Sequence, residues 1–544
     1  HHLFAFLFAT ILIIGANNVD SVSTRALIGL EKLFNWKFSI QVVSIISTVI
    51  IFSSGINDSY EPIRHVDWHI GLYNVLAQNL VDYGVFSKCG AAVNIEGNIA
   101  YNYSGCWVYP TYWFNPMLWP IAGSIKLGIN PIIASRIIIL ICHSVIFILI
   151  GKIVEIWFSR FAGVLSITAA SSSLQINFYG EIYAPQLAVI LWSLTLLYML
   201  SLELNGRELP GKSGSIISFS FIGPIIMGSA PTIFAMGLFF SGYFIFNERK
   251  KEMSKLFIIS TISGIASWFV WRYTVDYYWG GMGGSETNLL GKARHRSQSL
   301  DYLSSFDYYL TTIERAGWLL NVVVICGLFM LVFQVLTRKV DEAEYPKFSR
   351  NLMFVCAPFI LIQIQIFLMF PQSINQHDYL NAYWLLIPGS IAFATIAQRK
   401  FSIVTVLFLI LSFTLISSDL EKMDSRHEGS NNPHLHQVQS WMYHNLDSDE
   451  TVLMSDDLYE NKFIAALASN NVLVRPVEDT SAFFDEWLEE TAFDVVIVNT
   501  NTENHWSLYA NEDFISEWCL VEASKYDAIM PYHVSSDYYI FKIC

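Results

Sequence analysis

Long apolar runs, separated by short polar segments, recur along the first 418 residues of the chain. Most approach the roughly 20 residues that a helix needs to cross a bilayer. The pattern predicts a polytopic α-helical membrane protein with about twelve transmembrane helices. The runs cover residues 3–16, 38–56, 132–150, 161–178, 183–202, 215–228, 231–246, 256–276, 317–336, 352–370, 380–397 and 401–418.

The segment at residues 65–84 differs from these runs, because its apolar positions recur near helical spacing with polar residues between them. This pattern predicts an amphipathic helix that lies on the membrane interface. Asp67 stands at the start of the segment, shortly after the apolar run that ends at residue 56. A carboxylate there stays ionised and can take a proton, although the helix dipole would favour an N-cap aspartate at the same place.

A second unusual segment, residues 109–128, is apolar but contains Pro110, Pro116 and Pro120. Breaks of this kind are tolerated at membrane depth where protein or a cavity satisfies the backbone. We therefore expect a re-entrant or interfacial helix here, within a first outer loop that covers residues 57–130.

Basic residues predict the orientation, because cytoplasmic loops are enriched in Lys and Arg. With residues 57–130 outside, Lys32 and Lys37 fall on the cytoplasmic side, as do Lys152 and Arg160. Among the tight basic clusters, the exception is at residues 292–296, in a Gly-rich outer loop that covers residues 277–316. An anionic ligand is the simplest reason for a basic cluster on that side.

Charge divides the chain into two predicted domains. Residues 419–544 hold 24 acidic and 6 basic residues, whereas residues 1–418 hold 22 acidic and 26 basic ones. In the acidic part, strand-like runs at residues 451–455, 472–477, 495–499 and 538–543 alternate with helical patterns at residues 457–468 and 481–490. This alternation predicts a soluble extracytoplasmic α/β domain with a mainly parallel sheet. No basic stripe is large enough to suggest nucleic-acid binding.

The seven cysteines fall into two groups. Cys142, Cys326 and Cys356 lie inside apolar runs and are expected in the core. The other four lie in predicted outer segments, where thiols oxidise, so we expect the bridges Cys89–Cys106 and Cys519–Cys544. No cysteine and histidine cluster has the spacing of a metal site.

Polar residues suited to chemistry gather at the predicted outer face. Asp67 could deprotonate an acceptor hydroxyl or amine, and arginines could hold a phosphate leaving group. Ordinary roles also fit, because outer Arg and His residues contact lipid phosphates, Glu181 would cap a helix and His377 would anchor at the interface. The gathered residues are Arg64, His65, Asp67 and His69; Glu181; Lys292, Arg294, His295, Arg296 and Arg315; and His377, Asp378 and Tyr379.

The order of these short motifs resembles that of the GT-C glycosyltransferases, which include protein O-mannosyltransferases and lipid A aminoarabinose transferases. The resemblance covers residues 38–397. The stretch from Asp67 to Gly84 resembles the first outer loop, which carries the catalytic Asp in that family. The other matching positions are Asn115-Pro116-Met117-Leu118, in place of His-Pro-Pro-Leu; Leu127-Gly128 with Arg136, in place of Phe-Gly and Ala-Arg-Leu; Glu181 with Pro185; and His377-Asp378-Tyr379 with Pro388.

The chain departs from the family pattern at several of these positions. Trp68 follows Asp67 where Glu is frequent, Asn115 replaces the usual His, and Gln186 stands where Asp is frequent. The sequence also has no Asp-x-Asp motif at this site. These departures weigh against a divalent metal, and no other cofactor is expected.

The resemblance implies a glycosyltransferase of the cell or inner membrane. It would transfer a sugar from a polyprenyl-phosphate donor to an extracytoplasmic protein, lipid or glycan, with inversion. Asp67 would be the general base, His69 and Glu181 further catalytic residues, and the acidic domain would position the acceptor or a protein partner. Donor, acceptor and membrane lipids would be contacted by Arg64, His65, Asn115, Lys292, Arg294, Arg296, Arg315, His377, Asp378 and Tyr379.

Two alternatives to this enzyme are open at the level of sequence. One is a transporter or flippase for lipid-linked sugars, which would need charged residues deep in the spans. The other is a structural subunit of a larger membrane complex, with the acidic domain as its docking module.

Overall fold

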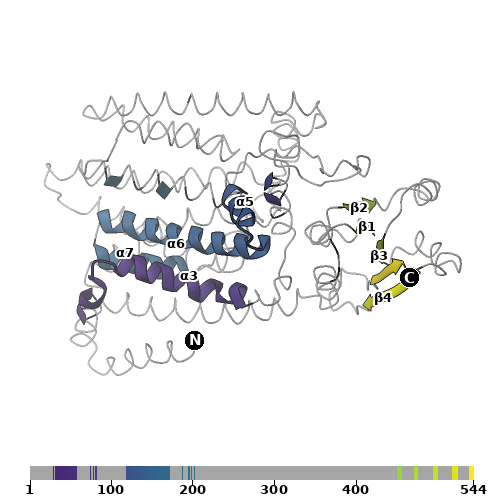
Figure 1. Cartoon of the computed structure of the whole chain (residues 1–544). Coiled ribbons are helices and arrows are strands. Elements are labelled where there is room, and N and C mark those ends of the chain that lie inside the picture. The colour runs from purple at the N-terminus through teal and green to yellow at the C-terminus, as the bar shows by residue number, and fades with distance from the viewer. Residues whose placement is uncertain are drawn as a thin grey trace, which may run out of the picture. The chain divides into compact units, whose positions relative to one another are not determined.

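The computed structural model consists of two compact units (Figure 1). One comprises His1–Ser53, Tyr112–Phe114 and Ile139–Lys422, and the other Ser54–Thr111, Asn115–Ile138 and Met423–Cys544. The structure describes residues 28–29, 31–57, 74, 77–78, 80–81, 118–157, 159–171, 187, 191, 194–195, 198, 201–202, 262, 445, 447, 450–455, 471–475, 494–499, 518–524 and 538–543.

Three described helices coincide with predicted apolar runs. They are α3 (Ser39–Asn57), α6 (Pro131–Trp157) and α7 (Arg160–Ser171). Helix α6 is longer than predicted, since it continues past residue 150 to Trp157. We had expected Lys152 in the loop that follows the apolar run, and this was wrong, because Lys152 lies in α6. Lys152 and Glu155 pair at i, i+3 spacing, which lets the helix continue through polar residues.

The polarity of α3 is the reverse of that in a water-soluble helix. Its buried face includes Ser44 and Thr48, whose hydroxyls donate to the carbonyl oxygens of Ile40 and Ser44 at 2.7 and 2.8 Å. Its exposed face carries Ile45, Ile46 and Val49. Apart from the buried Ile40, hydroxyl residues lie inside and large apolar residues outside, which suits a helix that faces lipid.

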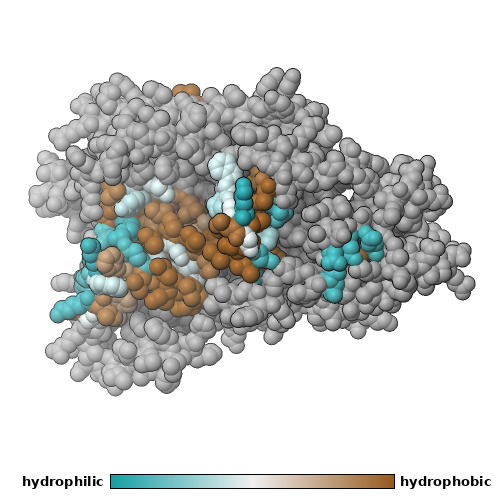
Figure 2. Space-filling view, in the orientation of Figure 1, coloured by the Kyte–Doolittle hydropathy of each residue, from teal (hydrophilic) through white to brown (hydrophobic). Residues whose placement is uncertain are grey.

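Helix α6 also exposes an apolar stripe, formed by Ile137, Ile141 and Val145 at i, i+4 spacing. Figure 2 shows hydrophobic surface along the described helices, with hydrophilic residues gathered near the end where α3 begins. Among the described residues, one helix, Pro131–Ile156, is long and apolar enough to cross a membrane, and Ser39–Ile50 is a shorter apolar helix. The predicted number of about twelve spans extends beyond the described residues.

Helices α3, α6 and α7 approach one another closely at two glycines. A Cβ atom added to Gly163 of α7 would lie 2.5 Å from the carbonyl oxygen of Gly151 in α6. One added to Gly151 would lie 2.9 Å from Cγ2 of Ile40 in α3. Only residues without a side chain permit this approach, which is a common way to pack helices in membranes.

A tight corner joins α5 (Leu118–Lys126) to α6. The backbone N–H groups of Gly128 and Ile129 donate to the carbonyl oxygens of Ile125 and Ser124, at 2.8 and 3.0 Å. This is a Schellman motif, and Gly128 adopts the positive φ of 83° that the motif needs. Two residues on, Asn130 caps α6 by accepting from the N–H of Ile132 at 3.0 Å.

Helix α5 lies within the segment that we predicted to be re-entrant or interfacial. Its nine residues span only about 14 Å at the rise of an α-helix, which is too short to cross a bilayer. Pro120 lies in its first turn, where the N–H group that proline lacks would have no partner within the helix. Residues 109–117 of the predicted segment lie outside the described residues.

Replacing Gly128 with Ala should lower the free energy of unfolding by about 1–2 kcal/mol, the cost of left-handed geometry for a residue with a Cβ atom. No atom lies within 4 Å of that Cβ position, so backbone conformation alone causes the loss. Thermal unfolding in detergent would measure it. Gly123→Ala in α5 is the matched control, because its Cβ also meets open space and its φ is not positive. Equal stability of the two variants would contradict the prediction.

The C-terminal sheet has five strands in the order β2-β1-β3-β5-β4. Four predicted strands are confirmed as β1 (Thr451–Ser455), β2 (Asn471–Arg475), β3 (Val495–Asn499) and β5 (Tyr538–Ile543). Pairs β1–β2 and β1–β3 are parallel, whereas β3–β5 and β4–β5 are antiparallel, so the expectation of a mainly parallel sheet was wrong. We missed β4 (Trp518–Ser524), because a register shift between Leu520 and Glu522 breaks its alternation. The predicted helices between the strands lie outside the described residues.

Candidate functional site

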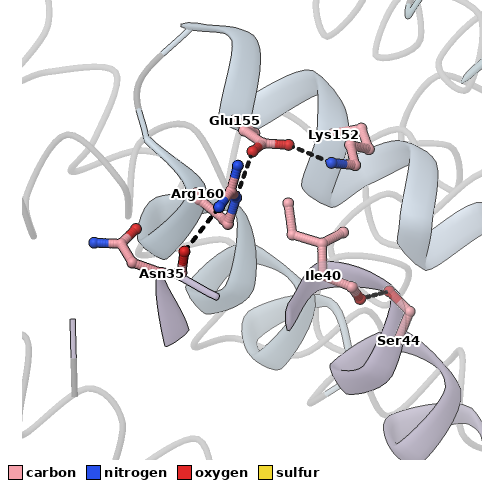
Figure 3. A network of polar contacts seen from close by, with 6 residues as sticks. All are labelled: Asn35, Ile40, Ser44, Lys152, Glu155 and Arg160. Carbon is pink, nitrogen blue, oxygen red and sulfur yellow. Dashed lines mark hydrogen bonds and ion pairs between the residues drawn. The ribbon is translucent and has the colours of Figure 1, made fainter. Parts of the chain in front are cut away.

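Polar contacts hold together one end of the three-helix packing (Figure 3). The carboxylate of Glu155 accepts from Nζ of Lys152 and, at 2.8 Å, from Nε of Arg160. Nη1 of Arg160 also donates to the carbonyl oxygen of Asn35 at 2.7 Å. The segment before α3 and the connection from α6 to α7, which we predicted on the same side of the membrane, therefore meet. That this side is cytoplasmic stays a prediction.

The predicted interfacial segment at residues 65–84 is helical wherever the structure describes it. Asn74 and Ala77 are fully buried, and Gln78, Leu80 and Val81 are half-buried. Residues 74, 77 and 81 share one face of a helix, so this face packs inward. The burial of Asn74 was not predicted, because in an amphipathic helix the apolar residues, and not Asn74, are expected on the buried side.

Asn74 contacts α6 near the start of that helix. Its Nδ2 atom lies 3.4 Å from Oγ of Ser135, and this hydroxyl donates to the carbonyl oxygen of Ile132 at 2.8 Å. Asn74 and Ser135 are both completely buried. Ser135 lies in the second turn of α6, just after the Asn130 cap. The contact thus ties the segment that follows Asp67 to a helix end that is itself fixed by capping.

Sequence reasoning missed Asn74 and Ser135 as candidate site residues. A signal for Asn74 was present, because it stands seven residues after Asp67 and thus on the same face of a continuous helix. It is also a polar residue between the apolar positions Ile70, Ala77 and Val81 of that face. Ser135 gave no comparable signal, since a serine inside an apolar helix usually bonds to its own backbone.

Every residue that we predicted to be catalytic or to bind substrate lies outside the described residues. Their convergence on one cavity, above all that of Asp67, Glu181 and His377, stays a prediction. The full set is Asp67, His69, Glu181, Arg64, His65, Asn115, Lys292, Arg294, Arg296, Arg315, His377, Asp378 and Tyr379.

Several residues of the family-like motifs fall in the described part, among them Leu127, Gly128 and Arg136. Gly128 forms the corner between α5 and α6, and Arg136 follows Ser135 in α6. The motif that contains them therefore shapes the start of α6, where Asn74 binds.

Metal ligands and cysteines add little to the site in the described part of the chain. There, no group of three or more His, Cys, Asp and Glu residues could hold a metal ion. Cys142 is free and buried in α6, as predicted. Cys519 lies in β4, but Cys544 and the pair Cys89 and Cys106 are outside the described residues, so both disulfides stay predictions.

Three solved structures, which belong to two proteins, resemble most of this chain. ArnT from Cupriavidus metallidurans, bound to undecaprenyl phosphate, matches with a TM-score of 0.55 at 10% identity, over 93% of this chain and 98% of ArnT. The oligosaccharyltransferase of Archaeoglobus fulgidus, in complex with Zn and sulfate, matches with a TM-score of 0.50 at 11% identity, over 92% of this chain and 73% of the enzyme. The same enzyme tethered with an acceptor peptide containing the NVT sequon gives a TM-score of 0.50 at 11% identity, over 92% and 74%.

The chain has a GT-C-like fold. This confirms at the level of fold the resemblance that the short motifs indicated. No protein-family profile and no curated protein matches the chain at the level of sequence. With identities of 10–11%, the GT-C-like fold is shared while most side chains differ.

Proposed function

We propose that this protein is an integral membrane glycosyltransferase that uses a polyprenyl-phosphate sugar. The observation that carries the proposal is the GT-C-like fold, which extends over 93% of this chain and 98% of ArnT, a protein bound to undecaprenyl phosphate in its crystal structure. The oligosaccharyltransferase likeness supports the same class of reaction. The inverted polarity of α3 and the apolar stripe of α6 suit a protein embedded in lipid.

In the proposed reaction, Asp67 takes a proton from the acceptor hydroxyl or amine while the freed lone pair attacks the anomeric carbon. The bond from that carbon to the phosphate oxygen breaks, and polyprenyl phosphate leaves with the electron pair. Attack from the face opposite the leaving group inverts the anomeric centre. Arg294, Arg296 and their neighbours in the loop at residues 277–316 stabilise the charge on the departing phosphate. The acidic C-terminal domain, outside the membrane, positions the acceptor or a protein partner.

A transporter of lipid-linked sugars is the second candidate, and the described spans favour the enzyme over it. Helix α3 contains no charged residue, and the charged residues of α6 lie toward its ends, at Arg136, Lys152 and Glu155. Transport paths place charged groups deep in the membrane. His143, near the middle of α6, is the described side chain most like a charged group deep in the membrane. It is buried and already has an interaction partner.

The decisive test is transfer by the purified full-length protein from a panel of polyprenyl-phosphate sugars, with release of polyprenyl phosphate as the readout. At least one donor should be consumed in the presence of acceptor. Arg294→Ala should then raise the donor KM by about 10- to 100-fold, because a charged hydrogen bond to phosphate is lost. Lys32→Ala, on the predicted cytoplasmic side, is the control and should leave KM unchanged. Movement of a lipid-linked sugar across vesicles without any transfer would instead support the transporter.

A further inference from the structure

Asn74 holds a buried polar atom with no hydrogen-bond partner. Its Oδ1 atom is shielded and unpaired, while Nδ2 faces Oγ of Ser135. Turning the amide over would not relieve this, because the Ser135 hydroxyl gives its proton to the carbonyl of Ile132 and can only accept from Asn74. A buried unpaired carbonyl carries a desolvation penalty. Stability alone would therefore favour an apolar residue at position 74.

Two other described side chains have a buried unpaired oxygen, Ser39 and Gln41, and both lie in the first turn of α3. Asn74 differs from them, because its amide also reaches a side chain 61 residues further along the chain. It thus links two separate helical segments while carrying an unfavourable atom. This combination is typical of residues retained for function rather than for stability.

The position of Asn74 on its helix suggests what that function is. Asn74 and Ala77 form the buried face of the described helical residues. Seven residues correspond to nearly two full turns, so the sequence predicts that Asp67 lies on this same face, about 10 Å along the helix axis. Any rotation of the helix about its axis would move Asp67 and Asn74 together.

We propose that Asn74 is a positioning residue for sugar transfer, which, through Ser135, fixes the rotation of its helix, predicted from the sequence to begin at Asp67, against the start of α6. This inference rests on the proposed function, in which Asp67 is the general base. A base that is displaced by about 1 Å loses much of its effect, because proton transfer needs close alignment. The unpaired Oδ1 atom is the stability cost of keeping that alignment.

The test compares Asn74→Leu and Ser135→Thr with wild type, each in the full-length protein. Asn74→Leu should lower kcat by about 10- to 100-fold with unchanged donor KM. Its thermal midpoint should stay equal or rise, because the unpaired atom is gone. Ser135→Thr, which keeps the hydroxyl, should retain most of kcat. Ser44→Ala is the matched control, since Ser44 is also buried and bonds to its own helix, and it should leave kcat unchanged.

A lower thermal midpoint with wild-type kcat in Asn74→Leu would overturn the inference, because that result indicates a purely structural role. Failure of the proposed function gives a different result, in which wild type transfers sugar from no donor and the positioning role falls with it. The contact itself is tested without activity, by oxidative cross-linking of the Asn74→Cys, Ser135→Cys double variant with the single variants as controls. Absence of the linked peptides in folded protein would overturn the contact.

Discussion

Replacing Asp67 with Asn should reduce sugar transfer by about 10²- to 10⁴-fold, the usual cost of losing a general base. Asn has nearly the same size as Asp but cannot accept the acceptor's proton at neutral pH. The protein should still insert and unfold at the wild-type temperature, because the substitution keeps the polar character of an interfacial position. Turnover of the best donor from the panel, measured at saturating acceptor, checks this result.

The matched control for Asp67 is Asp82→Asn, on the same predicted helix but about 22 Å further along its axis. It should leave turnover unchanged. The two variants separate a specific base from a general need for negative charge at this membrane face. Near-normal turnover by stably inserted Asp67→Asn protein would contradict the assignment of Asp67 as the base, and with it the mechanism proposed above.

The helices and most strands were predictable because each depends on a short, local pattern. Apolar runs of sufficient length specify α3, α6 and α7, and short strand-like runs of about five apolar residues specify β1, β2, β3 and β5. Ends were less predictable, since α6 continues to Trp157 through the charged residues Lys152 and Glu155, which pair with each other. The strand β4 was not predicted, because the register of its pairing with β5 shifts between Leu520 and Glu522 and interrupts the alternation of its side chains.

The candidate site was predictable as a set of residue types, but not as an arrangement. Motif order places Asp67, Glu181 and His377 at the outer ends of different spans. Which spans are neighbours depends on packing between helices far apart in sequence, and local periodicity carries no such information. Asn74 illustrates the limit: its helix was predicted, yet its contact with Ser135 depends on tertiary packing over 61 residues.

The described motif at Leu127, Gly128 and Arg136 shows what a short pattern can mean physically. The glycine is needed for a left-handed residue after α5, and the following Asn130-Pro131 starts α6 with a side-chain cap and a proline in the first turn. The motif is therefore a corner that sets the start of α6. In the proposed enzyme, that corner also determines where Ser135 meets Asn74.

Replacing Gly163 with Ala should destabilise the three-helix packing by about 1–3 kcal/mol, the usual range for overpacking in a close-packed core. The added Cβ atom would lie 2.5 Å from the backbone oxygen of Gly151, and backbone cannot move aside as a side chain can. The helix propensity of Ala offsets part of this cost. Thermal unfolding in detergent or nanodiscs would measure the loss.

Gly151→Ala provides an internal comparison, because its Cβ would meet only side-chain atoms, at 2.8 Å from Cδ1 of Ile167 and 2.9 Å from Cγ2 of Ile40. The loss should be smaller, and the second change Ile40→Ala should recover part of it by removing one obstacle. The same second change should help Gly163→Ala much less, since it removes only the contact with Cδ1 of Ile40 at 3.0 Å and leaves the backbone oxygen of Gly151 at 2.5 Å. Equal recovery of both variants by Ile40→Ala would show that side chains, and not the backbone contact, set the separation of α6 and α7.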